Sequence, residues 1–235
     1  MTKHTGYTLL IIVFFGMSTS VFAQRFQGAV MGGMNLSQVD GDEVYGFKRV
    51  GGHIGLGVIL PIKKWDITLE TVFNQKGAIQ KDQYQHWVYD SVGNTVDSTQ
   101  YTGAYNLRLN YVEIPLIAHF TDRGRYTVGA GFSYGRLVSF SEIEHDGSIP
   151  PYSDTVKFNK NDYNIIFDLQ IRIWRQLKFN LRYSYSLASI RERTFHDVIY
   201  QLKDPWTRKQ YNNMLTFRLV YVFNEQYEPA VRSEP

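Results

Sequence analysis

The chain contains no cysteine among its 235 residues, which excludes disulfide bonds and thiolate chemistry. Its formal net charge of +3 is too small to favour nucleic acid as a partner. Beyond the first 23 residues, no apolar run approaches the roughly 18 residues that a transmembrane helix needs. These shortages exclude a disulfide-stapled domain, a nucleic-acid-binding protein and a helical membrane protein.

The first 23 residues have the composition of a secretory signal peptide. A weakly basic start at Lys3 precedes the mainly apolar stretch Tyr7–Met17, and Val21–Ala23 supplies residues that a signal peptidase reads. We therefore expect cleavage before Gln24, and the absence of cysteine there excludes a lipoprotein. An N-terminal membrane anchor is the alternative, although the apolar stretch is short for a bilayer-spanning helix.

Eight later segments alternate apolar and polar side chains, the pattern of β-strands. In Tyr163–Ile173 every odd position is aromatic or aliphatic, whereas Asp168, Gln170 and Arg172 occupy even positions. The 17 tyrosines and 15 phenylalanines are numerous enough to form aromatic belts at two membrane interfaces. The expected strands are Arg25–Leu36, Val50–Leu60, Trp65–Gly77, Leu107–Phe120, Arg125–Leu137, Tyr163–Ile173, Leu177–Leu187 and Leu215–Phe223.

The connections between these segments are alternately short and long, which favours a membrane barrel. Bacterial outer-membrane barrels have short periplasmic turns and long extracellular loops. A soluble eight-stranded ligand carrier is the alternative, but it would place its apolar face inside and would not need this asymmetry. We predict an all-β, eight-stranded antiparallel transmembrane β-barrel in the outer membrane, with outer-membrane lipid around it. The expected parts are a signal peptide at 1–23, the barrel at 24–223 and a short periplasmic tail at 224–235.

The fourth expected strand changes phase. Leu107 and Leu109 are odd, whereas Val112 and Ile114 are even. A bulge near Asn110 would reconcile these positions, because one additional residue reverses the faces of a strand.

The predicted inner face carries many charges. An eight-stranded barrel is just wide enough for its side chains to fill, and buried charges persist only when they are paired. We interpret this set as an ion network that closes the lumen, and a gated proton or ion path is the alternative. The set comprises Glu70, Glu113, Asp168, Arg172, Lys178, Arg182 and Arg218.

The sequence offers no pattern typical of catalysis or of metal binding. The histidines, including His53 and His119, show no HxH or HxxxH spacing, and no GxSxG element occurs. We therefore predict a non-enzymatic protein with no catalytic residue, metal or cofactor. A lipid-modifying outer-membrane enzyme remains an alternative.

The long polar segment Asp82–Gln100 contains alternating residues that predict a hairpin around Gly93, extending beyond the membrane. Trp87 and Tyr89 in this segment could anchor a protein or a glycan, which would make the loop a docking surface. A plainly solvated loop is an equally good interpretation. A surface adhesin that acts through its long loops is therefore an alternative function.

Several motifs resemble one family. Gly28–Ser37 reads GxxxGGxNLS, Lys76 and Gly77 close the third expected strand, and Leu109–Leu116 reads LNYVEIPL. Together they resemble the PorT-type outer-membrane β-barrel proteins of Bacteroidetes over essentially the whole mature chain. The resemblance implies an eight-stranded barrel, and it implies an accessory or scaffold role in type IX-like protein export or envelope organisation, with other envelope or secretion proteins as partners. Within it, we expect Glu113 to pair with Arg182 or Arg218.

Overall fold

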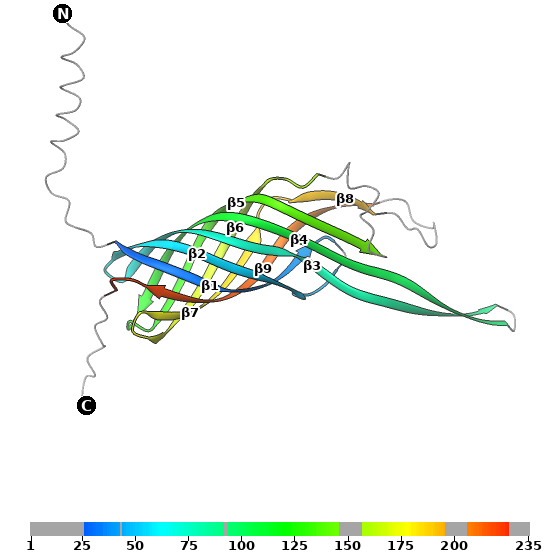
Figure 1. The fold of residues 1–235 in the computed structure, drawn as a ribbon, viewed down its shortest axis with the longest axis horizontal. Helices are drawn as coiled ribbons and strands as arrows, with labels where there is room; N and C mark the ends of the chain where they lie inside the picture. The colour runs from blue at the N-terminus through cyan, green and yellow to red at the C-terminus, as the bar shows by residue number, and fades with distance from the viewer. Residues whose placement is uncertain (1–25, 43, 92–93, 146–156, 196–205, 226–235) are drawn as a thin grey trace, which may run out of the picture.

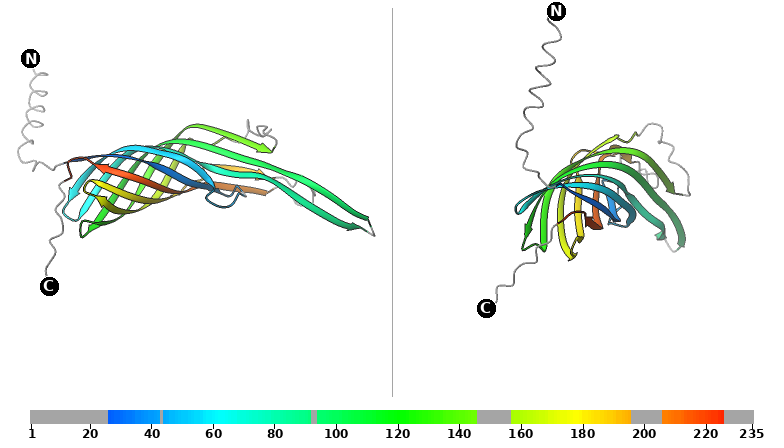
Figure 2. Two further views of the ribbon diagram at one scale, coloured as in Figure 1. Left: turned by 60° about the horizontal axis from the view of Figure 1, so that its bottom comes forward. Right: turned by 60° about the vertical axis from the view of Figure 1, so that its left-hand side comes forward.

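Eight strands of this computed structural model form a closed antiparallel ring, which Figures 1 and 2 show as a tilted, elongated barrel. Neighbouring strands pair in order from β1 to β7, β9 pairs with β7, and β1 pairs with β9 to close the ring. The structure describes residues 26–225, except residue 43 and the segments 92–93, 146–156 and 196–205. The expected signal peptide at 1–23 and most of the expected tail at 224–235 lie outside this range.

The strands follow the alternation of the sequence. Each of the eight expected segments overlaps one strand of the ring, so the predicted fold class is confirmed. The described strands are β1 (Gln27–Asp40), β2 (Arg49–Ile62), β3 (Trp65–Ser91), β4 (Asn94–Asp122), β5 (Tyr126–His145), β6 (Asn161–Trp174), β7 (Leu177–Ser186), β8 (Arg191–Phe195) and β9 (Trp206–Val222).

The apolar face of the ring points outward. On β2, Ile54 is 62% exposed, whereas the adjacent His53 is 4% exposed. On β6, Phe167 is exposed and the adjacent Asp168 is buried. An apolar exterior around a polar interior is the arrangement of a barrel that is solvated by hydrocarbon. Among the described residues, no helix is long and apolar enough to cross a membrane.

The alternation of β4 is not reversed where we expected a bulge. Leu107 and Leu109 are fully buried inside the barrel, on the same face as Glu113. The register between β4 and β5 does shift at Asn110 and Tyr111, but the additional residue belongs to β5. The expected phase reversal is therefore wrong, because the apolar residues near the outer end of β4 face the interior of the barrel instead of lipid.

β3 and β4 continue far past the ring as a two-stranded hairpin, drawn in green at the right of Figure 1. Their pairing runs out to Ser91 and Asn94, which confirms the expected hairpin, although Gly93 itself lies outside the described residues. β8 was not expected from the sequence. It pairs with the outer end of β9 and adds a short strand on the extracellular side of the ring.

Candidate functional site

The centre of the lumen is occupied by two arginines and two carboxylates. Glu70 on β3 accepts hydrogen bonds from Nη1 of Arg182 at 2.8 Å and from Nη2 of Arg218 at 2.9 Å. Arg182 also donates from Nε to Oδ1 of Asp168 at 2.7 Å. All four side chains are at most 3% exposed. Because each charge meets an opposite charge at hydrogen-bond distance, the group fills the lumen without an unpaired ion.

A second ion cluster lies nearer the extracellular end. The Nζ of Lys76 on β3 is 2.6 Å from Oε1 of Glu113 and 3.0 Å from Oδ2 of Asp162. The side-chain amide of Asn74 donates to Glu113 at 2.8 Å, and that of Asn212 donates to Asp162 at 2.9 Å. The expectation that Glu113 pairs with Arg182 or Arg218 is therefore wrong. Those arginines are engaged by Glu70 and Asp168, and Lys76 is the cation within reach.

Two glycines on β5 make room for these contacts. Gly135 lies between Glu113 and Asp162 in the register, and Gly129 lies between His119 and Asp168. A Cβ on Gly129 would lie 2.2 Å from Cδ2 of His119, and one on Gly135 would lie 3.1 Å from Cγ of Glu113. The small inner face of β5 thus lets polar side chains from β4 and β6 approach each other across it.

The periplasmic end of the lumen is bridged by a residue that follows the last strand. Glu225 contacts Arg172 at 2.7 Å and Lys178 at 2.9 Å. Burial alone would raise the pKa of Glu225, but the hydrogen bonds from Arg172 and the charge of Lys178 hold that pKa below its usual value. Arg172 and Lys178 thus lie at this mouth of the barrel, away from the central group.

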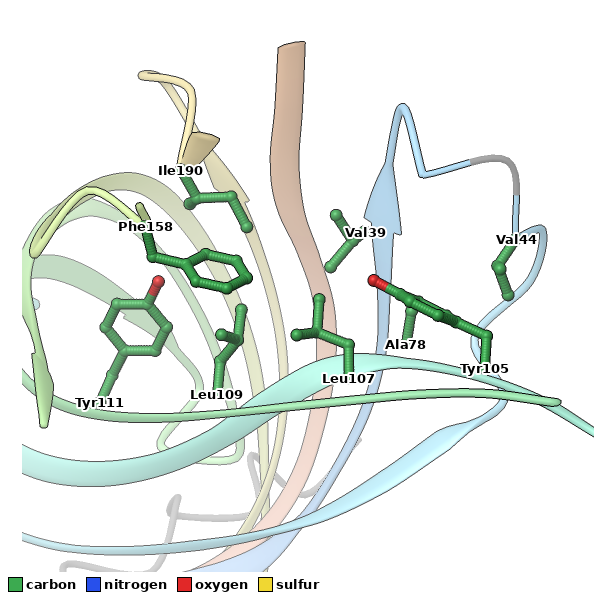
Figure 3. Close-up of a cluster of buried hydrophobic side chains, with 9 residues drawn as sticks. All are labelled: Val39, Val44, Ala78, Tyr105, Leu107, Leu109, Tyr111, Phe158 and Ile190. Carbon is green, nitrogen blue, oxygen red and sulfur yellow. The ribbon is translucent and has the colours of Figure 1, made fainter. Parts of the chain in front are cut away.

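The extracellular end of the barrel interior is apolar, which the sequence analysis did not anticipate. Side chains from three strands and from three connections meet there, as Figure 3 shows. Several of them have no exposed surface. This apolar cap excludes water from the outer end of the lumen. It consists of Val39, Val44, Ala78, Tyr105, Leu107, Leu109, Tyr111, Phe158 and Ile190.

Polar side chains anchor the apolar cap on its outer side. Arg191 on β8 contacts Glu142 on β5 at 2.5 Å and the hydroxyl of Tyr105 at 3.1 Å. Nearby, Asp42 accepts a hydrogen bond from the backbone N–H of Val44 at 2.8 Å, whereas its Oδ2 is buried without a partner. Burial raises the pKa of Asp42 to about 7, despite that hydrogen bond and the charge of Arg191.

The two described barrel histidines belong to the polar network. His119 lies 3.1 Å from the Thr68 hydroxyl through Nδ1 and 3.1 Å from Asp168 through Nε2. His53 contacts Asn74 at 2.6 Å. A space of about 20 Å³ remains beside Thr68 and His119. A cavity of that size holds roughly one water molecule, so it cannot admit an organic substrate.

Trp87 and Tyr89 lie on β3 in the projecting hairpin. The backbones of Trp87 and Tyr89 pair with Ser98 and Val96 in the projecting hairpin, while their side chains lie outside the description. Within the described residues, no group of three or more His, Asp or Glu side chains is arranged to hold a metal ion.

Lys76 and Asp162 belong to the inner network although they are absent from the predicted set of lumen charges. Lys76 continues the even-numbered inner positions of β3, and Asp162 precedes the inner positions of β6 by one step. Lys76 already lies within the expected strand Trp65–Gly77, and extending the expected strand Tyr163–Ile173 by one residue toward the extracellular side would have added Asp162. The contacts of Arg191 could not be found in this way, because β8 was not expected.

The closed ring, the apolar exterior and the paired charges inside define a transmembrane β-barrel of the outer-membrane type. A family model described as an outer membrane protein beta-barrel domain matches residues 22–192. The chain belongs to this family, and it is an outer-membrane protein. No curated protein matches the sequence.

Solved structures of outer-membrane proteins are similar to this chain at low identity. Ail of Yersinia pestis is 11% identical with a TM-score of 0.40, covering 84% of this chain and 98% of its own. OprG of Pseudomonas aeruginosa is 10% identical with a TM-score of 0.40, covering 86% and 98%. The protease OmpT of Escherichia coli is 12% identical with a TM-score of 0.41, covering 88% and 99%.

Proposed function

We propose that this protein is a non-enzymatic barrel of the PorT type from a member of the Bacteroidetes. Its role in this proposal is that of an accessory or scaffold in type IX-like protein export or in envelope organisation, with other envelope or secretion proteins as partners. The observation that carries the proposal is the filled lumen. Paired charges occupy its centre, and the apolar cap covers its outer end. A barrel without a passage acts through its surfaces.

The projecting hairpin supports a surface-directed role. β3 and β4 pair over 27 and 29 residues, about three times the roughly 9 to 11 residues that cross a membrane. The paired ladder holds this extension in an ordered shape, as a binding element requires. The same hairpin favours the second candidate function, which is a surface adhesin.

A lipid-modifying enzyme is a weaker candidate. Thr68, His119 and Asp168 lie in the order of a nucleophile, a base and an acid. However, Asp168 is already held by Arg182, and Gln170 contacts the same nitrogen of His119 at 3.0 Å. The adjacent space is too small for a lipid chain. The proposal therefore assigns this group to the structural network.

The test combines gene deletion with complementation by three variants. Deletion should reduce the secretion of cargo proteins, and the complete chain should restore it. A variant in which Asp82–Gln100 is replaced by a tight turn should fold into a heat-modifiable barrel but fail to restore secretion, because the segment lies outside the lipid-spanning ladder. Replacing Trp87 and Tyr89 by serine tests the two proposed anchors without shortening the hairpin.

The third variant, His119→Ala, separates the candidate functions. It should fold and restore secretion if the protein is a scaffold. The enzyme candidate would be favoured over the scaffold if the variant with the shortened hairpin were fully active while a correctly folded His119→Ala barrel were inactive. Normal secretion after deletion, with loss of surface attachment in the shortened variant, would identify an adhesin.

A further inference from the structure

The outer wall of the barrel carries a carboxylate without a cationic partner among the described residues. Asp40 is the last residue of β1 and is half-buried. Its Oδ1 accepts a hydrogen bond from the side-chain amide of Gln38 at 2.8 Å, and its Oδ2 accepts one from that of Asn213 at 3.3 Å. In the part of the chain that the structure describes, no lysine or arginine forms an ion pair with Asp40. In this respect it differs from Glu70 and Asp168, which are paired with arginines.

The backbone register places Asp40 opposite Tyr211 on the same outer face. Val39 belongs to the apolar cap inside the barrel, so the next residue of β1, Asp40, points outward. Asn212 contacts Asp162 in the lumen, so Tyr211, which precedes it on β9, also points outward. Asp40 and Tyr211 are direct partners in the pairing of β1 with β9. Side chains that lie directly opposite each other on one face are neighbours, about 5 Å apart at Cβ.

A second tyrosine, from β7, joins this pair. Ser186 on β7 is fully buried in the lumen, so Tyr185 beside it points outward. The rings of Tyr185 and Tyr211 lie nearly parallel, at an angle of 13°, with their centroids 6.2 Å apart, and both residues are half-buried. Tyr185 is also the register partner of Asn213, whose amide donates to Asp40. The carboxylate and the two rings therefore form one cluster of outward side chains.

The cluster lies at the outer edge of the lipid-facing band. Tyr221, whose hydroxyl donates to Gln176 in a periplasmic turn, follows Tyr211 by ten residues on β9. Ten residues in a strand tilted by about 40° rise roughly 25 Å along the barrel axis, which is about the height of the apolar band of such barrels. Between the two tyrosines, Leu219 is apolar and 49% exposed. The cluster is therefore level with the lipid headgroups of the outer leaflet.

We propose that Asp40, Tyr185 and Tyr211 form a binding site for the ammonium group of a lipid headgroup. A carboxylate beside a lipid-facing wall is unfavourable unless a cation compensates its charge. An ammonium group donates charge-assisted hydrogen bonds to a carboxylate, and the faces of tyrosine rings attract it. The lipid supplies this cation at the level where Asp40 lies. The site is on strands other than those of the projecting hairpin, so it does not depend on the proposed role in export.

The test measures lipid binding to the purified full chain in an uncharged maltoside detergent, by native mass spectrometry and by titration. The probes are short-chain phosphatidylethanolamine, phosphatidylcholine and phosphatidylglycerol. Phosphatidylethanolamine should bind most tightly, because its primary ammonium group can donate to Asp40. Phosphatidylcholine should bind less tightly, since its trimethylammonium group is attracted to the rings but has no N–H. Phosphatidylglycerol, which carries no cation, should bind most weakly.

Three variants test the individual contacts with phosphatidylethanolamine. Asp40→Asn should weaken binding about tenfold or more, because it removes the charge that the ammonium group meets. Tyr211→Leu should weaken binding about threefold or more, because it removes one ring face. Tyr163→Leu is the matched control and should bind like the wild type. Its ring packs against Tyr134 at 5.6 Å in another tyrosine pair, where the Tyr134 hydroxyl donates to Asn161 instead of to a carboxylate.

Free ethanolamine distinguishes a headgroup from a soluble amine. The proposal expects no competition from ethanolamine at low millimolar concentration, and effective competition would overturn it. Equal binding of the three lipids, or equal binding by wild type and a heat-modifiable Asp40→Asn barrel, would also overturn it. A loss in Tyr163→Leu as large as that in Tyr211→Leu would show a general aromatic belt and not a site. If Asp40→Asn fails to fold, Tyr211→Leu and the order of the three lipids decide the outcome.

Discussion

Lys76 and Glu113 form a contact of 2.6 Å inside the barrel, and their side chains are 1% and 3% exposed. Lys76 also contacts Asp162, so two buried carboxylates from two other strands share a single ammonium group. We therefore expect the free energy of unfolding of the barrel to depend more on this cation than on either carboxylate.

Replacing Lys76 by methionine should destabilise the barrel by about 3–5 kcal/mol, because two carboxylates would lose their buried partner. Adding Glu113→Gln to Lys76→Met should recover part of that loss, since only Asp162 would then remain uncompensated. Urea unfolding in lipid vesicles, followed by tryptophan fluorescence, measures both variants. A double variant less stable than Lys76→Met alone would contradict the pairing.

Replacing Arg182 by leucine should also destabilise the barrel by about 3–5 kcal/mol. The substitution leaves Asp168 without its main cation and Glu70 with Arg218 alone. The control is Arg123→Leu at a periplasmic turn, where the arginine side chain is 86% exposed and should matter by less than about 0.5 kcal/mol. Similar stabilities of the two variants would show that the central network is not a structural one.

The purified protein should give no stable conductance of porin size in planar bilayers. The paired charges occupy the centre of the lumen, the apolar cap covers its outer end, and the described space beside His119 is about 20 Å³. Substituting Leu107 and Leu109 by alanine removes apolar volume from the cap, so this variant is more sensitive to any residual conductance. Large, steady openings of the wild-type protein would contradict a closed lumen and favour a gated path.

The stability of the first extracellular connection should fall as the pH rises. The pKa of Asp42 is about 7 in the folded chain and 3.8 for a free side chain. Between these values the folded state holds a proton that the unfolded chain has released, so stability decreases from about pH 4 to about pH 7 and then stays low. The total loss is at most roughly 4 kcal/mol, from 1.36 kcal/mol per pKa unit.

Asp42→Asn should remove this pH dependence, because the amide does not ionise. Hydrogen exchange of the backbone around Val44, measured from pH 5 to pH 8 and corrected for the intrinsic rate, reports local opening. Asp122→Asn at a periplasmic turn, where the acid is 59% exposed, is the matched control. An unchanged pH profile in Asp42→Asn would show that Asp42 is not the group that titrates.

Alternation alone was sufficient to predict most of the ring, because membrane barrels repeat one rule on every strand. Thr68 and Glu70 on β3, or Asp168 on β6, stand beside apolar neighbours that face lipid. Alternation shows which residues of a strand share a face. It does not show whether that face contacts lipid, water or the interior of the barrel. Leu107 and Leu109 have the periodicity of lipid-facing residues, yet they point inward and belong to the buried apolar cap.

The individual ion pairs could not be predicted from the sequence. Which cation meets Glu113 depends on the stagger between strands and on the space left by Gly135, and neither is visible in one strand's alternation. Glu225 was likewise assigned to a polar tail, although it folds back onto Arg172. Strand faces are local properties, whereas pairing across a lumen is a property of the complete ring.

The pairing of β1 with β9 also constrains the order of assembly. Thr216 donates a hydrogen bond to Asn35 across 181 residues of sequence, so the ring cannot close until its last strand has arrived. Until then, β1 and β7 would each present an unpaired edge, and hydrocarbon offers no partners for such backbone groups. A nascent chain that ends before Trp206 should therefore remain outside the bilayer and depend on periplasmic chaperones. Insertion and closure must occur together, which makes the C-terminal strand the step that commits the chain to the membrane.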